Sequence, residues 1–244
     1  MKPEVVAELA PRGVLRAGIN LSNFLLVTGR GPEGEPQGVA PDLARAVADR
    51  LGVPVRYVTY PRPAELADAA GTGAWDIGLI GAEPQRAERI AFTPAYVEIE
   101  STFLVPPGSA ITSLEEVDRP GVRIAVASGA AYDLWLSRNL RHAELVRAPS
   151  IPASFDLFRD GGLEVLAGLR PRLVADAEAL PGARVLEGRF SAVQQAVGTA
   201  RANAAGAAFL RDFVEEAKSS GLVAELIARH GVRGLTVAPA SPVP

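Results

Sequence analysis

Strand-like and helix-like segments alternate along the first third of the chain, and this alternation constrains the fold more than any other feature. Apolar runs at residues 14–19, 53–60 and 77–80 have the length and composition of strands. Residues 42–52 keep a helical period of apolar residues that ends at a glycine, and residues 63–70 indicate another helix. This order predicts an α/β fold built on a parallel, doubly wound sheet.

Residues 75–96 contain the clearest candidate for a binding site. They predict a buried strand that breaks at Gly81 and a short helix that begins at Pro84, since proline suits the first helical turn. Arg86 would lie in that turn, beside free N–H groups and the positive end of the helix dipole, where a carboxylate is favoured. The alternative is a surface arginine paired with Glu83, because charged residues at this spacing are common on helix surfaces.

Polar and aromatic residues follow the strand at residues 14–19. Asn20 and Asn23 come at its carboxyl end, which is where open α/β sheets bind ligands. The same residue types are equally suited to a turn. Aromatic side chains that could cover a ligand, or belong to the core instead, are Phe24, Tyr60, Tyr96 and Tyr132.

The second half of the chain offers two further candidates. A strand at residues 121–127 precedes a turn of small residues at 128–131, and this arrangement can expose N–H groups to an anion. Residues 163–169 indicate a short helix, and residues 172–175 a buried strand with Asp176 at its carboxyl end. The alternative for Asp176 is a helix cap.

Composition excludes several kinds of site. The net charge of −3 and the pI near 5.6 argue against a nucleic-acid binder or a polybasic membrane binder. The chain has no cysteine, which excludes disulfides, thiolate metal sites and cysteine nucleophiles. His142 and His230 are its only histidines, so a site with three histidine ligands is impossible. We therefore expect no metal and no cofactor.

Two extended segments, near residues 97–105 and 190–197, separate a middle block from the two ends of the chain. The simplest arrangement is two α/β lobes with a cleft between them. We expect the first lobe to contain residues 1–103 and 196–244, and the second to contain residues 104–195.

Polar residues in these two extended segments are further candidates. Glu100 lies in the first segment, where it could face either the cleft or solvent. Gln194 and Gln195 lie in the second. Because neighbours alternate sides of a strand, we expect one of the two glutamines to face the cleft.

Six stretches, taken in order, resemble the family 3 solute-binding proteins, which are the amino-acid-type receptors of bacterial ABC importers. The resemblance begins with VLRAGI before the first site loop, GVAPDLARAVADRLG as the first long helix, and WDIGLIG with PQRAERIAFTPAY as the central strand, Pro-x-Arg turn and exit. It continues with GVRIAVASGAAYDLWL as the opening of lobe two, AGLRPRLVAD as a later strand that ends in Asp, and FLRDFVEEAKSSGLVAELIARHG as the closing helices. It covers residues 14–239 and implies the type II periplasmic binding protein fold, two Rossmann-like lobes joined by two hinge strands.

The resemblance also implies roles for individual residues. Arg86 matches the arginine that binds the ligand's α-carboxylate, and Asp176 matches the aspartate that pairs with its ammonium group. Asn20 and Asn23 fall in the first site loop, residues 80–82 line the site, and residues 129–131 match a lobe-two turn that also meets the carboxylate. With the aromatic, acidic and hinge candidates, the expected ligand-binding residues are Arg86, Asp176, Asn20, Asn23, Phe24, Ile80, Gly81, Ala82, Glu83, Glu100, Gly129, Ala130, Ala131, Tyr132 and Gln194.

The chain also departs from the family's pattern around this site. Gly81 stands where a serine or threonine is frequent, and Glu83 and Ala131 stand where a threonine is usual. Pro171 and Arg172 replace the usual Asp-Ala pair before the lobe-two strand. Either backbone N–H groups hold the carboxylate, or the ligand is not a standard α-amino acid.

We expect a binding protein without catalytic activity, which closes on a small, polar, carboxylate-bearing and amino-acid-like ligand for an ABC importer. Two alternatives remain: an enzyme similar to the cyclohexadienyl dehydratases, with Glu83 or Glu100 as general acid, and a freestanding ligand sensor. We expect a monomer that binds no nucleic acid. The N-terminus lacks a signal peptide's apolar region, which predicts a periplasmic protein if a leader was removed and a cytoplasmic one if Met1 is the native start.

Overall fold

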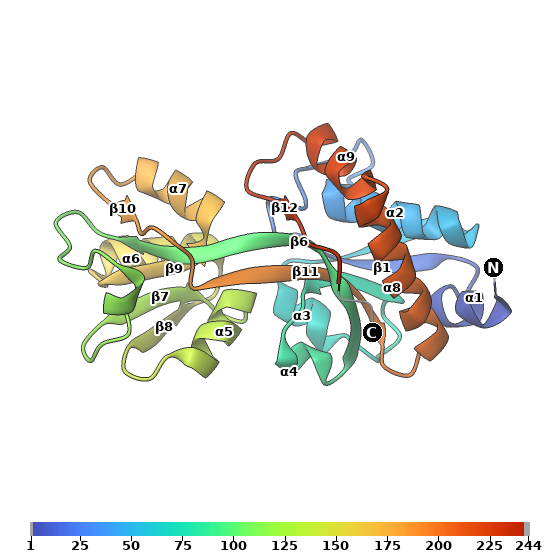
Figure 1. Ribbon diagram of the computed structural model, residues 1–244, viewed down its shortest axis with the longest axis horizontal. Coiled ribbons are helices and arrows are strands. Elements are labelled where there is room, and N and C mark those ends of the chain that lie inside the picture. Colours follow the sequence, from blue (N-terminus) through green and yellow to red (C-terminus); the bar gives the residue numbers. More distant parts are fainter. Residues whose placement is uncertain (1, 242–244) are drawn as a thin grey trace. The chain divides into compact units, whose positions relative to one another are not determined.

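A computed structural model describes residues 2–241, so Met1 and residues 242–244 lie outside the description. The chain divides into two compact units (Figure 1). Unit 1 contains Met1–Glu98 and Gln194–Pro244, and unit 2 contains Ile99–Val193. Both units combine strands with helices, and the α/β class predicted from the sequence is confirmed.

Unit 1 alternates strands and helices before the chain leaves it, and the C-terminal helices complete it. Its elements are α1 (Pro3–Leu9), β1 (Leu15–Asn20), β2 (Gly29–Arg30), β3 (Pro36–Gln37), α2 (Val39–Leu51), β4 (Val55–Tyr60), α3 (Pro63–Asp68), β5 (Ile77–Gly81), α4 (Pro84–Ala87), the first part of β6 (Ile90–Val105), the last part of β11 (Ser191–Ala200), α8 (Ala204–Ser219), α9 (Leu222–Arg229) and β12 (Thr236–Val237). In the sheet, β1 lies between β4 and β5, with all three parallel, and β11 runs antiparallel beside β5. The carboxyl ends of β1, β4 and β5 therefore share one edge of the sheet.

The largest core cluster of unit 1 joins this sheet to α1, α2, α8 and α9. The helical period read from the sequence places Leu43, Val47 and Leu51 of α2 in that cluster, and all three are buried. The helix ends at Gly52, whose φ of 73° is a left-handed conformation that glycine adopts without strain. It begins at Val39, before the predicted start, because Gly38 is the residue that caps it.

The chain passes between the units within two long strands, β6 and β11. β6 has 16 residues and leaves unit 1 after Glu98, and β11 has 10 residues and re-enters unit 1 at Gln194. Within unit 1, Nε2 of Gln194 donates to Oε1 of Glu98 at 3.1 Å. The points at which the chain leaves and re-enters unit 1 therefore lie side by side.

Unit 2 has a sheet of the same kind. Its elements are the rest of β6, the 3-10 helix η1 (Leu114–Glu116), β7 (Arg123–Ala127), α5 (Ala131–Asn139), β8 (Glu144–Ala148), α6 (Ile151–Asp160), β9 (Val165–Leu169), α7 (Arg170–Glu178), β10 (Arg184–Val185) and the start of β11. β7 lies between β8 and β9, with all three parallel, and β9 also pairs antiparallel with β6. The carboxyl ends of β7, β8 and β9 thus share one edge.

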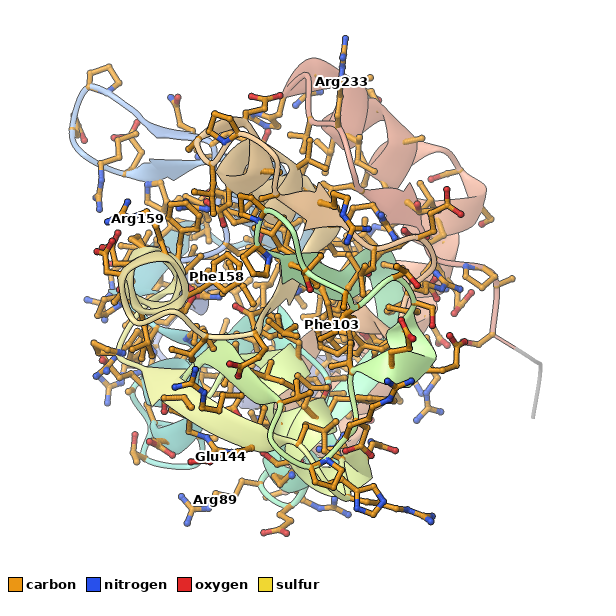
Figure 2. All side chains as sticks on the ribbon, turned by 90° about the vertical axis from the view of Figure 1, so that its left-hand side faces the viewer. Arg89, Phe103, Glu144, Phe158, Arg159 and Arg233 are labelled. Carbon is orange, nitrogen blue, oxygen red and sulfur yellow. The ribbon has the colours of Figure 1, made fainter. Side chains whose placement is uncertain are left out.

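Helix α6 shows how the core of unit 2 forms. The hydroxyl of Ser150 caps its N-terminus by accepting a hydrogen bond from the N–H of Ala153. Phe155 and Phe158 lie on its buried face and pack in a cluster with apolar residues of the sheet. Figure 2 shows Phe158 pointing inward, whereas Arg159 projects outward from the same helix.

The order of secondary structure around Asp176 differs from the prediction. Residues 163–169 were expected to be helical, but Val165–Leu169 form β9, a strand with all five residues buried. Residues 172–175 were expected to be a strand, but they belong to helix α7, which has Pro171 in its first turn. An apolar run this short cannot be assigned by periodicity alone, and the pairing of β9 with both β6 and β7 decides it.

We expect unit 2 to lose stability in acid, because of an ion pair that precedes β9. Glu164 accepts hydrogen bonds from Nε, Nη2 and the N–H of Arg123 at 2.8–3.0 Å, and these bonds lower the pKa of Glu164 to about 2. A depressed carboxyl pKa stabilises the fold above the unfolded value of about 4.3, and the contribution is lost as the pH falls toward 2. We expect Glu164→Gln to lower the free energy of unfolding by about 1 kcal/mol at pH 7, since the carboxylate is partly exposed and screened.

Urea unfolding of both proteins from pH 7 to pH 3 checks this expectation. The difference between wild type and Glu164→Gln should shrink as the pH falls below about 4.3. A difference that stays constant over this range would show that the ion pair is not its cause.

Candidate functional site

The candidate residues of unit 1 gather at one edge of its sheet. Asn20 and Tyr60 are paired residues at the carboxyl ends of β1 and β4, and Gly81 ends β5. Phe24 lies in the loop that follows β1, and Arg86 lies in α4, the short helix that follows β5. Ligands of open α/β sheets bind at this kind of edge.

Arg86 is a buried cation at this edge. Its side chain is almost covered, with 6% of the residue exposed, and Nη1 donates to the carbonyl oxygen of Gly81 at 2.7 Å. Burial lowers the pKa of Arg86 to about 10, and nearby Glu83 partly offsets this effect. The guanidinium therefore stays charged at neutral pH, and Arg86 is not the surface residue of the alternative interpretation.

The two asparagines of the first site loop have local hydrogen-bond partners. Oδ1 of Asn20 accepts from the N–H and the hydroxyl of Ser22 at 3.1 and 2.7 Å. Oδ1 of Asn23 accepts from the N–H groups of Leu25 and Leu26, both at 3.2 Å. These oxygens shape the turn, as the alternative predicted, and the turn presents Phe24, which is 38% exposed.

The end of β5 is tied to β11 by the backbone. The N–H of Ala82 donates to the carbonyl oxygen of Gln194 at 2.7 Å, one residue beyond the last ladder pair. Ile80 is 1% exposed, and its side chain packs with Leu66 and Trp75. Ile80 thus contributes packing, while the carbonyl oxygen of Gly81 and the N–H of Ala82 are bonded to Arg86 and Gln194.

The turn of small residues in unit 2 binds a carboxylate of the chain itself. Gly129 has a φ of 74°, and its N–H donates to Oδ2 of Asp133 at 2.8 Å. Asp133 is buried and forms an ion pair with Arg147 at 3.0 Å. Ala130, Ala131 and Tyr132 continue into α5 and are buried, and burial raises the pKa of the Tyr132 hydroxyl.

Asp176 does not lie at a strand end. It is buried within α7 and accepts from Nε of Arg172, one helical turn earlier, at 2.8 Å. Burial raises the pKa of Asp176, and Arg172 opposes that change. The cap alternative is also wrong, because Asp176 lies inside the helix, near its C-terminal end.

Three arginines with no role in the sequence analysis form ion pairs with acids of unit 2. Arg147 binds Asp133, and Arg170 binds Glu100 at 2.7 Å. Arg189 lies 3.8 Å from the same carboxylate of Glu100. Pro171 favours the first turn of a helix, so it indicates that a helix begins at Arg170 and that a strand ends just before it. It is the one signal in the sequence for this strand end.

Two searches of residues 2–241 bear on the chemistry of the protein. No group of three or more histidine, aspartate or glutamate side chains in this range is arranged to hold a metal ion. None of the helices in the same range combines the length and the apolar character needed to cross a membrane.

The strands and helices of both units define an α/β protein. Residues 22–232 match the model of the bacterial extracellular solute-binding proteins, family 3, and the chain belongs to this family. Proteins of the family bind small molecules and work with ABC transporters. The resemblance found in the sequence is confirmed.

Solved structures show the same fold at low identity. The ancestral amino acid-binding protein AncCDT-1, a precursor of cyclohexadienyl dehydratase, is 22% identical with a TM-score of 0.75, and the match covers 92% of this chain and 97% of that one. A binding component of an ABC transporter from Wolinella succinogenes, complexed with lysine, is 21% identical with a TM-score of 0.74, over 89% and 95% of the two chains. A mutant of ArgBP from T. maritima is 21% identical with a TM-score of 0.74, over 93% and 99%. The predicted type II periplasmic binding protein fold is confirmed.

One curated relative contains a similar segment within a longer protein. The membrane-bound lytic murein transglycosylase F of Maricaulis maris is 30% identical over 141 residues. These residues make up 54% of this chain but only 28% of that protein. The chain therefore spans little more than a quarter of that relative.

Proposed function

We propose that this protein binds a small, polar, carboxylate-bearing solute and carries out no reaction on it. The observation that carries the proposal is the buried, charged Arg86 at the carboxyl ends of the unit 1 strands. A charge-assisted hydrogen bond to a carboxylate is strong at such a desolvated position. Membership of a solute-binding family supports the same function.

Other groups at this edge suit a small ligand. The exposed ring of Phe24 offers an apolar contact beside the turn that Asn20 and Asn23 shape. Gly81 and Ala82 carry no side chain large enough to block an approach to the backbone. We propose these residues, with Arg86, as the ligand contacts of unit 1.

Delivery of the solute to the membrane subunits of an ABC importer is the second part of the proposal. It rests on the family, whose model is described as extracellular. A location outside the cytoplasm is part of the same proposal, and cell fractionation with an antibody to the protein tests it.

Arg86→Ala tests the ligand contact. We expect a carboxylate solute to raise the melting temperature of the wild type, since a ligand at 100 times its Kd stabilises a protein by about 2.7 kcal/mol. Arg86→Ala should bind the same solute about 10- to 100-fold more weakly, because it loses a charge-assisted hydrogen bond. Thermal shift across amino acids and organic acids, followed by titration calorimetry of each hit, measures both effects.

Two further variants test whether the loss of binding is specific to the guanidinium group of Arg86. Arg89→Ala removes an exposed arginine that follows α4 and points away from unit 1 (Figure 2), so its binding should equal that of the wild type. Arg86→Lys keeps the charge but loses the planar fork, and it should fall between wild type and Arg86→Ala. Wild-type affinity in Arg86→Ala would rule out Arg86 as the anchor.

An enzyme on the same fold is the second candidate function. It is favoured by the similarity to AncCDT-1, which is a precursor of a cyclohexadienyl dehydratase. Against it, Glu100 would have to break its 2.7 Å ion pair with Arg170 before it could donate a proton. Turnover of prephenate or arogenate by the purified protein would favour the enzyme.

A further inference from the structure

A small, largely apolar pocket lies within unit 2, among residues that the candidate site does not use. Its volume is about 160 Å³, and Phe103, Trp135 and Phe190 belong to its lining. Phe103 is part of β6 and Phe190 directly precedes β11, so both segments that connect unit 2 with unit 1 contribute to its wall. Every residue of the lining belongs to unit 2, and the pocket therefore depends on this unit alone.

The pocket lies away from the carboxyl ends of the unit 2 strands, which is where an open α/β sheet binds a ligand. Helix α5 begins just after the carboxyl end of β7, but the C-terminal half of this helix, at Leu136 and Asn139, lines the pocket. Val117 and Asp118 also line it, and they precede β7 rather than follow it. The pocket is therefore a different feature from the turn of small residues at 128–131.

The aromatic rings of the pocket pack against one another. The ring centroids of Phe103 and Phe190 are 4.5 Å apart, and those of Phe190 and Trp135 are 5.3 Å apart. Phe103 is 3% exposed, whereas Trp135 and Phe190 are both partly exposed. A ring from a ligand would extend this aromatic group at the centroid distances of about 4.5–7 Å that aromatic pairs prefer.

The volume of the pocket sets the size of its occupant. An apolar protein cavity of about 150 Å³ accommodates benzene. The pocket of unit 2 has a similar volume, and its lining includes partly exposed residues such as Leu114 of η1, so a small molecule can enter it from solvent. A single six-membered ring therefore matches the space.

The charges around the pocket favour an uncharged ring. Asp118 is the one charged residue among the described residues of the lining, and its carboxylate already accepts from the N–H groups of residues 141–143 at 2.8–3.2 Å. The neighbouring arginines in the sequence, Arg119, Arg138 and Arg141, are exposed and do not line the pocket. Asp118 would repel an anionic ring. A cationic ring would lose hydration against an apolar surface, for a carboxylate that already has donors.

We infer that this pocket is a second small-molecule site, which takes a single uncharged aromatic ring such as that of a phenol. The aromatic group of Phe103, Trp135 and Phe190 recognises the ring, and the volume limits the ligand to one ring. The inference goes beyond the proposed function, because the pocket shares no residue with the proposed solute contacts around Arg86.

The experiment uses the two tryptophans of the chain as reporters. Trp135 lines the pocket, whereas Trp75 belongs to unit 1 and is 6% exposed. Fluorine NMR of protein that carries fluorinated tryptophan gives a signal for each, and Trp75→Phe assigns them. We expect phenol to shift the signal of Trp135, with a Kd of about 1 mM or lower, and to leave that of Trp75 unchanged.

Three further molecules define the class of ligand. Benzoate and benzylamine carry a negative and a positive charge on the same ring, and each should bind about tenfold more weakly than phenol. Cyclohexanol keeps the hydroxyl but replaces the aromatic ring with a saturated one. It should bind about two- to tenfold more weakly, because it loses the aromatic pairing.

Two variants locate the site. Leu114→Trp fills the pocket from its partly exposed side and should weaken phenol binding about tenfold or more, measured by titration calorimetry. Val174→Trp places the same side chain on α7 of unit 2, at a residue that is 45% exposed and outside the pocket, and should bind phenol as wild type does.

Several results would overturn the inference. If phenol leaves the Trp135 signal in place, or shifts that of Trp75 equally, the pocket is not a site for it. If benzoate or benzylamine binds as tightly as phenol, the site does not select an uncharged ring. Wild-type affinity in Leu114→Trp would place phenol elsewhere. The comparisons in wild type hold even if Leu114→Trp does not fold.

Discussion

Replacing Asp76 with alanine is expected to lower the free energy of unfolding by about 3–5 kcal/mol, because it leaves a buried positive charge without its partner. Arg16 in β1 reaches Asp76 with Nη2 at 2.6 Å and Nε at 3.0 Å, and its backbone N–H lies 2.8 Å from the same carboxylate. The two side chains are only 6% and 4% exposed. Urea unfolding of wild type and Asp76→Ala at pH 7 measures the loss.

Two further variants test whether the burial of the ion pair, rather than its contact distance, sets the loss of stability. Glu216→Ala breaks an ion pair with Arg50 that has the same 2.6 Å distance, but there the side chains are 56% and 46% exposed. It should lower the free energy of unfolding far less than Asp76→Ala does, because exposed ion pairs contribute little to stability. Arg16→Leu combined with Asp76→Ala should recover much of the loss, because it removes the unpaired charge. Equal losses in Asp76→Ala and Glu216→Ala would show that burial does not set the cost.

Gly38→Ala is expected to destabilise unit 1 by about 2–5 kcal/mol, because both its backbone and its surroundings require glycine. Gly38 has a φ of 146° and a ψ of −175°, a region that side chains with a Cβ rarely adopt. A Cβ there would lie 2.3 Å from the carbonyl oxygen of Leu26. That oxygen accepts from the N–H of Ala40 at 3.1 Å, so it cannot move without loss of a bond.

The matched control lies four residues earlier. Gly34 also has a positive φ, 82°, but a Cβ there meets nothing within 4 Å. Gly34→Ala should therefore cost only about 1–2 kcal/mol, the cost of the backbone conformation alone. Thermal unfolding of the two variants checks the difference, and equal costs would show that the contact with Leu26 is not tight. Because Leu26 also bonds to Asn23, Gly38→Ala should weaken solute binding as well.

The elements of unit 1 could be predicted because their patterns are local. The period of Leu43, Val47 and Leu51 identifies α2, and the apolar run that ends at Gly81 identifies β5. Glycine and proline mark where these elements stop and start. Such signals depend on a few neighbouring residues, so a single sequence contains them.

The region from β9 to α7 could not be predicted in the same way. The run VLAGL fits a buried strand or a buried helix equally well, and only its pairing with β6 and β7 distinguishes them. The wrong choice then turned the first turns of α7 into a strand and moved the strand end from Leu169 to Asp176. Pro171 carried the missing information, since it favours the first turn of a helix.

The candidate site, too, could be predicted from the sequence only in part. Residue types at strand ends can be read from the sequence, and the structure does bring Asn20, Gly81 and Arg86 to one edge of unit 1. The hydrogen-bond and ion-pair partners of such residues cannot be read from the sequence, because these partners lie far away along the chain. The pairing of Arg147 with Asp133 and the burial of Arg16 beside Asp76 are both of this kind.

The two passages of the chain through β6 and β11 also set an order for folding during synthesis. Unit 2 is one continuous segment, Ile99–Val193, and it has all of its residues once the ribosome has passed Val193. Residues 1–98 of unit 1 precede unit 2, yet the core of unit 1 needs Leu210 and Phe213 from α8 and Leu226 from α9, which are synthesised after unit 2. Unit 1 therefore starts before unit 2 but completes its core after it, and its apolar surfaces stay uncovered while unit 2 is being made.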